Sequence, residues 1–183
     1  MASKAPLRIL NSLTNQKDLF EPQDANRVTW YQCGPTVYDE SHMGHARTYV
    51  CFDVMRRLLT DYFGYNVQLV MNITDIDDKI IRKAIEENKC FTDISRKFET
   101  EFLDDMRRLN VALPDCITRV SEFTDEIVAF IEKIIANGYA YESNGSVYFD
   151  VRKYSKSEGH TYAKLEPTSA SNLELLAEGE GVL

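Results

Sequence analysis

The amino-acid sequence predicts an α/β fold, in which parallel strands alternate with helices, followed by part of a smaller α+β region. Two short apolar runs, at residues 28–33 and 66–71, indicate buried strands. Between them, apolar residues recur at three- and four-residue steps, as on one face of a helix. Strand, helix and strand in this order form a βαβ unit, and the ligands of such sheets bind beyond the carboxyl ends of the strands.

The segment before the first strand, residues 1–27, carries weaker signals. Residues 7–10 (LRIL) predict a short strand. Thr14 and Asn15 are capping residues, so a helical turn is expected from there to Phe20, ending before Pro22. No function can be read from this segment.

The first buried strand, residues 28–33, ends at Gly34 and Pro35, which predict a tight loop. The helix after this loop is expected to stop near Gly64, a residue that favours helix ends. Its apolar stripe consists of Cys51, Met55, Leu58, Leu59 and Tyr62.

Three further helices are predicted in the middle of the chain. The first begins at Thr74, a capping residue followed by first-turn acids, and runs to about Glu87. The others span residues 93–109 and 121–137, the latter ending at Gly138. Their apolar stripes are expected to be buried: Ile94, Phe98, Phe102, Met106 and Leu109 in one helix, and Phe123, Ile127, Phe130, Ile131, Ile134 and Ile135 in the other.

The last part of the chain predicts a β-hairpin around Asn144 and Gly145, because an Asn-Gly pair favours a two-residue hairpin turn. From Arg152 onward the sequence is polar with weak periodicity. Only two strands of a parallel sheet are evident, so the sequence predicts the first half of a larger sheet domain.

Length and composition limit the class of protein. With 183 residues, 44% apolar and 27% charged, the chain predicts one globular domain with at most a small insertion. It contains no run of about 18 apolar residues, and its first residues lack the apolar segment of a secretory signal, so we expect a cytoplasmic protein without a membrane span. The four Cys lie far apart without a C-x-x-C pair, which argues against disulfides.

The loop after the first strand leads into the sequence HMGH, in which His42 and His45 flank Met43 and Gly44. A helix start favours anions, because unpaired N–H groups and the helix dipole point at the ligand. Two imidazoles there can stabilise charge that builds up on phosphoryl oxygens, and Gly44 would let a ligand approach the backbone. By itself the tetrapeptide is weak, since a stray metal pair or surface histidines that cap a helix explain it equally well.

Three blocks in order strengthen the interpretation. They are YQCGPTVYD (residues 31–39), HMGH (residues 42–45) and NITDIDDK (residues 72–79). HMGH resembles the HIGH motif of class I aminoacyl-tRNA synthetases, and the three blocks together resemble the cysteinyl-tRNA synthetases. The resemblance extends over nearly the whole chain, from Leu10 to Gly181.

The resemblance implies a Rossmann-like nucleotide-binding domain that an insertion, the connective polypeptide, splits in two. Residues 1–120 would be the first half of the catalytic domain, and residues 121–183 the front of the insertion. A stretch at residues 153–157 (KYSKS) imitates KMSKS, the second class I motif. Its place in the polar tail favours a solvated basic loop instead.

The resemblance also implies an activity, the ligation of cysteine to tRNA(Cys) through cysteinyl-adenylate. His42 and His45 would be catalytic and, with Gly44, would bind ATP, which enters with Mg²⁺ as a substrate. Gly34, Thr36 and Thr74 would line the amino-acid pocket, although a turn and a helix cap also explain Gly34 and Thr74. The acids at residues 75, 77 and 78 are better explained by a helix start than by a magnesium site.

Cys33 is ambiguous. A lone Cys at a strand end is usually a small buried hydrophobe, whereas the resemblance implies the first ligand of a Zn²⁺ ion whose remaining ligands lie beyond Leu183. Zinc binds thiolates strongly, so a substrate cysteine could add its own and serine would be rejected. With one ligand present, we expect weak zinc binding or none.

Two alternatives remain open. The chain could be a non-catalytic module that binds a nucleotide or a partner protein, or a cysteine ligase with an amino-sugar acceptor. For the tRNA ligase, the net charge of −8 places most phosphate contacts elsewhere or on a local basic patch. The resemblance puts the second nucleotide-binding motif beyond this sequence, so we expect the chain alone to be inactive.

Overall fold

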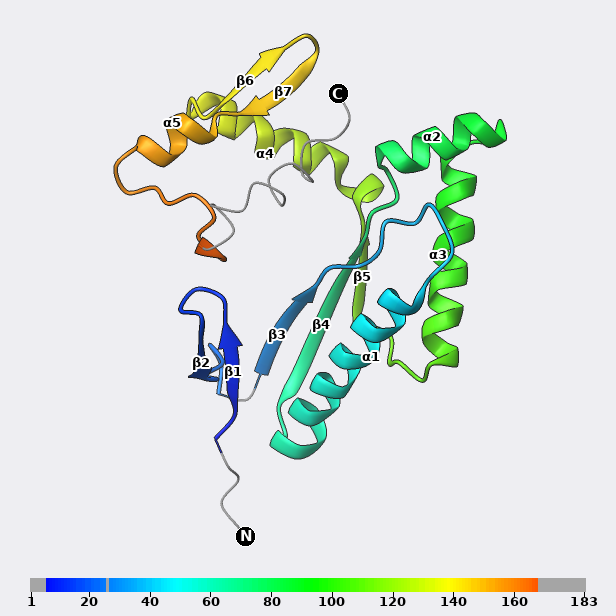
Figure 1. Ribbon diagram of the computed structural model, residues 1–183, viewed down its shortest axis with the longest axis vertical. Coiled ribbons are helices and arrows are strands. Elements are labelled where there is room, and N and C mark those ends of the chain that lie inside the picture. Colours follow the sequence, from blue (N-terminus) through cyan, green and yellow to red (C-terminus); the bar gives the residue numbers. More distant parts are fainter. Residues whose placement is uncertain (1–5, 26, 168–183) are drawn as a thin grey trace. The chain divides into compact units, whose positions relative to one another are not determined.

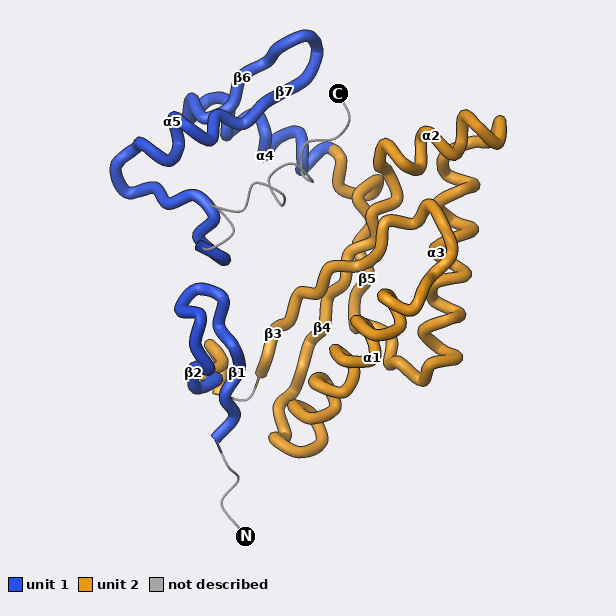
Figure 2. The backbone as a smooth tube through the Cα atoms, viewed as in Figure 1, with its two compact units in different colours: residues 1–20, 125–183 blue, residues 21–124 orange. Residues whose placement is uncertain are grey.

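The computed structural model describes residues 6–25 and 27–167, which fall into two compact units. Residues 21–124 form one unit, here called the sheet unit (Figure 2). The residues before and after it form the other, here called the hairpin unit. The predicted domain boundary at residue 120 lies close to the division between Thr124 and Asp125.

Three parallel strands form the centre of the sheet unit, in the order β3-β4-β5. They are β3 (Arg27–Gln32), β4 (Asn66–Ile73) and β5 (Cys116–Arg119). The expectation of only two parallel strands is therefore wrong. The sequence CITR in β5 has no apolar run, and its alignment comes from contacts with β4 and from Asp115, whose backbone N–H donates to the carbonyl of Leu69 (2.9 Å).

Three helices connect these strands: α1 (Met43–Arg57), α2 (Asp78–Glu87) and α3 (Phe91–Arg108). α1 continues into a π-helix, η1 (Leu58–Phe63), which ends at Gly64 with φ = 79°, as predicted. α2 begins four residues later than expected, because Asp77 rather than Thr74 is its N-cap. Thr74 instead extends the sheet by an isolated bridge to Thr36.

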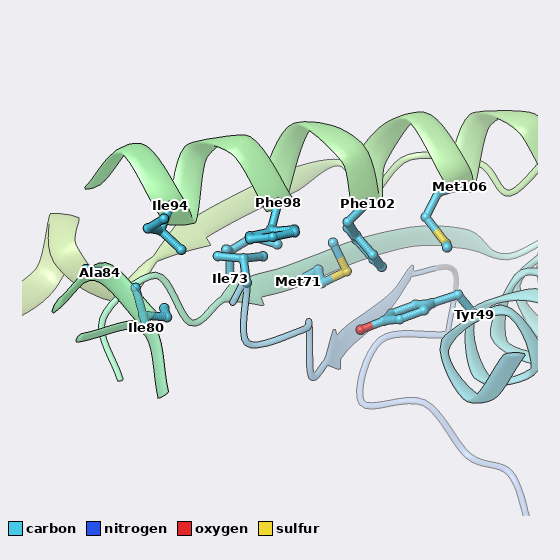
Figure 3. Packing of buried hydrophobic residues seen from close by; sticks show 10 residues of the cluster. Tyr49, Met71, Ile73, Ile80, Ala84, Ile94, Phe98, Phe102 and Met106 are labelled. Atoms are coloured by element: carbon cyan, nitrogen blue, oxygen red, sulfur yellow. The ribbon is translucent and has the colours of Figure 1, made fainter. Parts of the chain in front are cut away.

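The core of the sheet unit lies between the sheet and α3 (Figure 3). Four residues at four-residue steps on α3 point at β4 and are buried: Ile94, Phe98, Phe102 and Met106. Alternate residues of β4, Met71 and Ile73, meet them from below. Leu109, predicted as the end of the stripe, is 43% exposed because α3 ends before it.

α1 and α3 cover the same face of the sheet (Figure 1). Tyr49 of α1 packs edge-on against Phe102 of α3 at 5.0 Å between ring centroids, and Phe52 of α1 packs against Trp30 of β3. Right-handed connections between parallel strands place successive helices on one side when the strand order follows the chain. The alternate residues of β3 point the other way, and Tyr31 is 61% exposed.

The hairpin unit begins with two antiparallel strands, β1 (Arg8–Asn11) and β2 (Gln16–Leu19). The strand predicted at residues 7–10 is confirmed, but the helical turn after it is wrong. Asn15 has φ = 55°, and its N–H donates to the carbonyl of Asn11 (2.7 Å). This left-handed residue reverses the chain, which Asn tolerates better than most residues.

The rest of the hairpin unit contains α4 (Thr124–Ala136), β6 (Ala140–Ser143), β7 (Ser146–Phe149) and α5 (Val151–Lys156). A 3₁₀ turn, η2 (Val120–Phe123), leads into α4 from the sheet unit. The hairpin at Asn144 and Gly145 is confirmed, since both have φ above 50°. The predicted basic loop at residues 153–157 is mostly helical, because Asp150 caps α5 by accepting from the Lys153 N–H (2.8 Å).

The predicted burial of the α4 stripe is wrong. No side chain of α4 is buried in the described structure, and Phe130 is 64% exposed. The elements of its unit, two short hairpins and one short helix, offer too little apolar surface to cover it. Within the described ranges, no helix combines the length and apolar character that a membrane span requires.

Candidate functional site

His42 and His45 lie at the start of α1, where β3 has ended and the chain turns into the helix. His42 is the N-cap residue, and its Nδ1 accepts a hydrogen bond from the Gly44 N–H (3.0 Å). Nδ1 of His45 accepts from the His42 N–H (3.1 Å). The two imidazoles therefore cap the helix reciprocally, as Ser and Glu do in a capping box.

This capping fixes which ring nitrogens remain available. Because Nδ1 of each ring accepts a hydrogen bond, its lone pair is occupied and the proton of the neutral ring is on Nε2. The ring centroids of His42 and His45 are 4.1 Å apart. Burial, and next the nearby His42, lower the pKa of His45 below its usual value. The helix start thus carries two adjacent rings that can each donate from Nε2.

Gly44 is needed for this arrangement. A Cβ at this position would lie 2.7 Å from Cε1 and 2.9 Å from Nδ1 of His42. Here the space above Gly44 is filled by the His42 ring rather than open to a ligand, so the role of Gly44 in ATP binding stays a prediction. A groove of about 440 Å³ runs beside His42. Its lining includes Met43 and Ala46 of α1 and Asp105 and Arg108 of α3.

The three residues predicted for the amino-acid pocket come together at the carboxyl ends of β3 and β4. Thr36 and Thr74 form a parallel bridge. The Thr74 N–H donates to the Pro35 carbonyl (3.1 Å), and the Val37 N–H donates to the Thr74 carbonyl (3.2 Å). The backbone of Thr74 is therefore fully occupied, and only its side chain can contact a ligand.

Gly34 is fixed by close contact with β4. Its N–H donates to Oδ1 of Asn72 (2.8 Å), and a Cβ would lie 1.6 Å from the Asn72 carbonyl oxygen. Any other residue would push the loop away from the strand. Asn72 also donates from Nδ2 to the hydroxyl of Thr74 (3.3 Å), so one side chain joins Gly34 to Thr74.

Cys33 is a free, exposed thiol at the end of β3, not the core residue that its position alone suggests. Its carbonyl accepts from the hydroxyl of the buried Tyr49 (3.2 Å), which ties the strand end to α1. In the described residues, no group of three or more His, Cys, Asp or Glu side chains could hold a metal ion. Cys33 alone fits the role of one thiolate ligand.

The acids after β4 serve the fold. Asp77 caps α2 by accepting from the Lys79 N–H (3.0 Å). Asp75 is buried, and it accepts from both the N–H (2.9 Å) and the hydroxyl of Ser121. The residue next to Thr74 is thereby tied to η2, where the chain leaves the sheet unit.

A second polar contact joins β5 to α3. Arg119 donates to the buried carboxylate of Glu99 from Nε (3.0 Å) and Nη2 (2.5 Å), and from Nη1 to Glu122 (3.1 Å). These carboxylates raise the pKa of Arg119, with the Glu99 hydrogen bonds the largest cause. Arg119 and Glu99 line a polar pocket of about 530 Å³ together with Asp75 and Ser121.

Sequence reasoning missed Asn72, the Asp75–Ser121 contact and the Arg119–Glu99 pair. Asn is disfavoured inside strands, so its position in β4 was the one available signal. The two other contacts join residues 46 and 20 positions apart, and local patterns carry no information on them.

Comparison with known proteins identifies relatives of this arrangement. Residues 19–182 match the family described as tRNA synthetases class I (C) catalytic domain. A Dictyostelium discoideum protein named cytoplasmic cysteine–tRNA ligase is 57% identical over 180 residues, which cover 97% of this chain and 27% of that protein. An Encephalitozoon cuniculi cysteine–tRNA ligase is 56% identical over 150 residues, covering 82% of this chain and 31% of that protein.

A third relative, the cytoplasmic cysteine–tRNA ligase of Drosophila pseudoobscura pseudoobscura, is 37% identical, and the alignment covers 100% of this chain and 38% of that protein. The alignment runs over 282 positions, more than the 183 residues of this chain, so that relative carries additional residues inside the aligned region. This chain spans about a third of the length of these three relatives.

Proposed function

Because this chain belongs to the family of class I (C) tRNA synthetase catalytic domains, we propose that it forms the N-terminal part of a cysteine–tRNA ligase. In the proposed reaction, the carboxylate of cysteine attacks the α-phosphate of ATP, which enters with Mg²⁺. Cysteinyl-adenylate forms and pyrophosphate leaves. The terminal ribose hydroxyl of tRNA(Cys) then attacks the acyl carbon, and AMP leaves.

The observation that carries this proposal is the paired imidazole cap of α1. His42 and His45 present their Nε2–H groups at the amino end of a 15-residue helix, where the dipole also favours negative charge. Neutral donors fixed in advance can follow the charge that develops on phosphoryl oxygens without reorganising. The depressed pKa of His45 keeps its ring neutral near pH 7, so we propose hydrogen bonding rather than proton transfer as its role.

The amino-acid pocket is proposed at the carboxyl ends of β3 and β4, as expected for ligands of parallel sheets. Gly34, Thr36 and Thr74 would form its wall, and their mutual contacts support this placement. The Cys33 thiolate would hold a zinc ion there with ligands from outside this chain. Zinc, when bound, would supply a soft Lewis acid that selects a thiol over a hydroxyl.

The partners and the cellular compartment are proposed from the relatives. Two of the relatives described above are named cytoplasmic, which supports a cytoplasmic location. The net charge of −8 disfavours broad contact between this part and the tRNA backbone, so we place most tRNA contacts outside it.

The test is ATP–pyrophosphate exchange dependent on cysteine, with zinc present and serine as the control amino acid. We expect exchange from the full gene product with cysteine and not with serine, and none from the 183-residue chain alone. Exchange by the short chain would show that it is sufficient. Silence from both would contradict the ligase and favour a binding module. Cysteine activation followed by transfer to an amino sugar, but not to tRNA, would identify the other acceptor class.

A second arm tests the imidazole cap. His45→Gln keeps an acceptor for the His42 N–H but changes the donor, and we expect the rate constant of exchange to fall at least tenfold. His160→Gln, at an exposed His of the hairpin unit, is the matched control and should leave the rate unchanged. Equal rates for both variants would remove the His pair from the mechanism.

A further inference from the structure

Asn72 lies inside β4, at a position where a strand rarely contains Asn. Its side chain makes two hydrogen bonds of opposite sense, accepting at Oδ1 from the Gly34 N–H (2.8 Å) and donating from Nδ2 to the Thr74 hydroxyl (3.3 Å). The orientation of the amide is fixed, because a backbone N–H can only donate and must therefore face Oδ1. Nδ2 consequently faces Thr74.

This orientation determines the direction of the Thr74 hydroxyl hydrogen. A hydroxyl has one hydrogen and two lone pairs. The bond from Asn72 uses a lone pair, so the hydrogen cannot point at Asn72 and is left to donate elsewhere. Across residues 6–25 and 27–167, no acceptor for it lies within hydrogen-bonding distance, and the backbone of Thr74 is already paired with Pro35 and Val37.

We propose that Asn72 is a positioning residue that directs the Thr74 hydroxyl hydrogen toward an acceptor atom of the bound amino acid. This inference rests on the proposed function, and it assigns Asn72 no contact with the substrate. Its second bond has a separate effect. By taking the Gly34 N–H, Asn72 removes that donor from the pocket and leaves Thr74 as the donor on this wall.

Asn72→Asp is the sharpest variant, because Asp has the same shape but only acceptor oxygens. One oxygen can still accept from Gly34. The other faces Thr74, whose hydroxyl then donates to the carboxylate and is withdrawn from the ligand. We expect the KM for cysteine in pyrophosphate exchange by the full gene product to rise ten- to a hundredfold, with the KM for ATP changed less than twofold. Asn66→Asp, the same change at an exposed position at the start of β4, should leave both values unchanged.

The added charge could also repel the substrate directly, and a double-mutant cycle separates the two explanations. Thr74→Val removes the hydroxyl, and Thr74→Ser restores it as the conservative variant. If Asn72 acts through Thr74, Asn72→Asp raises the KM for cysteine in the wild type and the Thr74→Ser background but not in the Thr74→Val background. An equal rise in all three backgrounds, or no rise in the wild type, would overturn the inference.

Hydrogen–deuterium exchange keeps the test independent of activity. Asn72→Ala removes both bonds without adding charge, and we expect faster exchange in the peptide that contains Gly34, with no change for Asn66→Ala. A full gene product that shows no cysteine-dependent exchange of pyrophosphate would contradict the proposed function. The Gly34 amide then decides whether Asn72 fixes this loop, and unchanged exchange in Asn72→Ala would overturn the structural part as well.

Discussion

His45 links the stability of the α1 start to pH. In the folded protein its pKa lies below the usual 6.5, because the ring is half-buried and next to His42. Its Nδ1 also accepts from the His42 N–H, and a protonated ring cannot accept. Burial and capping therefore both favour the neutral ring.

The first prediction concerns this proton. Below pH 6.5 the unfolded chain takes up the proton before the folded one does, so the free energy of unfolding falls as the pH drops from 6.5 toward the lower folded pKa. Above pH 6.5 this contribution is fully present. His45→Gln keeps an acceptor at the third helical position but does not titrate. We expect urea unfolding of this variant at pH 5 and pH 7.5 to differ less than for the wild type, and an equal pH dependence would contradict the assignment.

The second prediction concerns Tyr49. Its hydroxyl donates to the Cys33 carbonyl while its ring packs against Phe102, so Tyr49→Phe removes one buried hydrogen bond and keeps the packing. We expect the free energy of unfolding to fall by about 1 kcal/mol. Tyr38→Phe, which removes a half-buried hydroxyl and leaves a ring beside Lys79, should change it by less than about 0.5 kcal/mol. A larger loss for the Tyr38 variant would show that the Cys33 contact is weak.

At the scale of the elements, α3 is joined to β5 by a charged contact at the edge of the apolar core. Glu99 is 8% exposed, and Arg119 meets both of its carboxylate oxygens. Removing one charge of such a pair leaves the other without compensation, which costs more than the pair itself contributes. The Arg119 side chain is 34% exposed, however, so water reduces this cost.

The third prediction follows from this contact. We expect Glu99→Gln to lower the free energy of unfolding by about 1 to 3 kcal/mol. Glu101→Gln, on the exposed side of the same helix and 3.9 Å from Lys97, should change it by less than about 0.5 kcal/mol. Chemical denaturation of the two variants under identical conditions compares them directly. Similar losses would indicate a general effect of charge on α3.

The sequence patterns predicted elements where burial was periodic and failed where long-range contacts decided. The stripe of α3 and the alternation in β4 come from a shared core, and each leaves a strong periodic pattern. β5 has only four residues and depends on pairing with β4. α2 begins late because Thr74 pairs with Thr36, a contact that no local pattern reports.

The candidate site was predictable to the same extent. Its motif residues fall on one strand end and one helix start, which sequence order indicates, and Gly34, Thr36 and Thr74 meet because two adjacent parallel strands end there. That His42 and His45 cap their own helix was not predictable, because such bonds depend on side-chain rotamers. Their roles toward ATP and amino acid remain predictions.

In the whole molecule, burial is concentrated in one unit. All buried residues in the described ranges lie between Val28 and Met106, within the sheet unit, and the hairpin unit has none. Segments with little buried surface open at low free energy, whereas core segments open only when the whole unit unfolds.

The fourth prediction follows from this distribution. Hydrogen–deuterium exchange of the chain should show strong protection for peptides from β4 and α3 and rapid exchange for β6 and β7. We expect the difference in protection to exceed a hundredfold, because the hairpin unit can open without disturbing the core. Equal protection in both regions would show that the units unfold together.

The order of the strands has a consequence for synthesis. Since β3, β4 and β5 lie side by side in the order in which they occur in the chain, each strand pairs with one that the ribosome has already made. At about 5–20 residues per second, β4 leaves the ribosome seconds before β5, and neither has to wait for a later strand to be inserted between them. The sheet unit can therefore assemble co-translationally from its amino-terminal edge, and α3 closes over the sheet before α4 is translated.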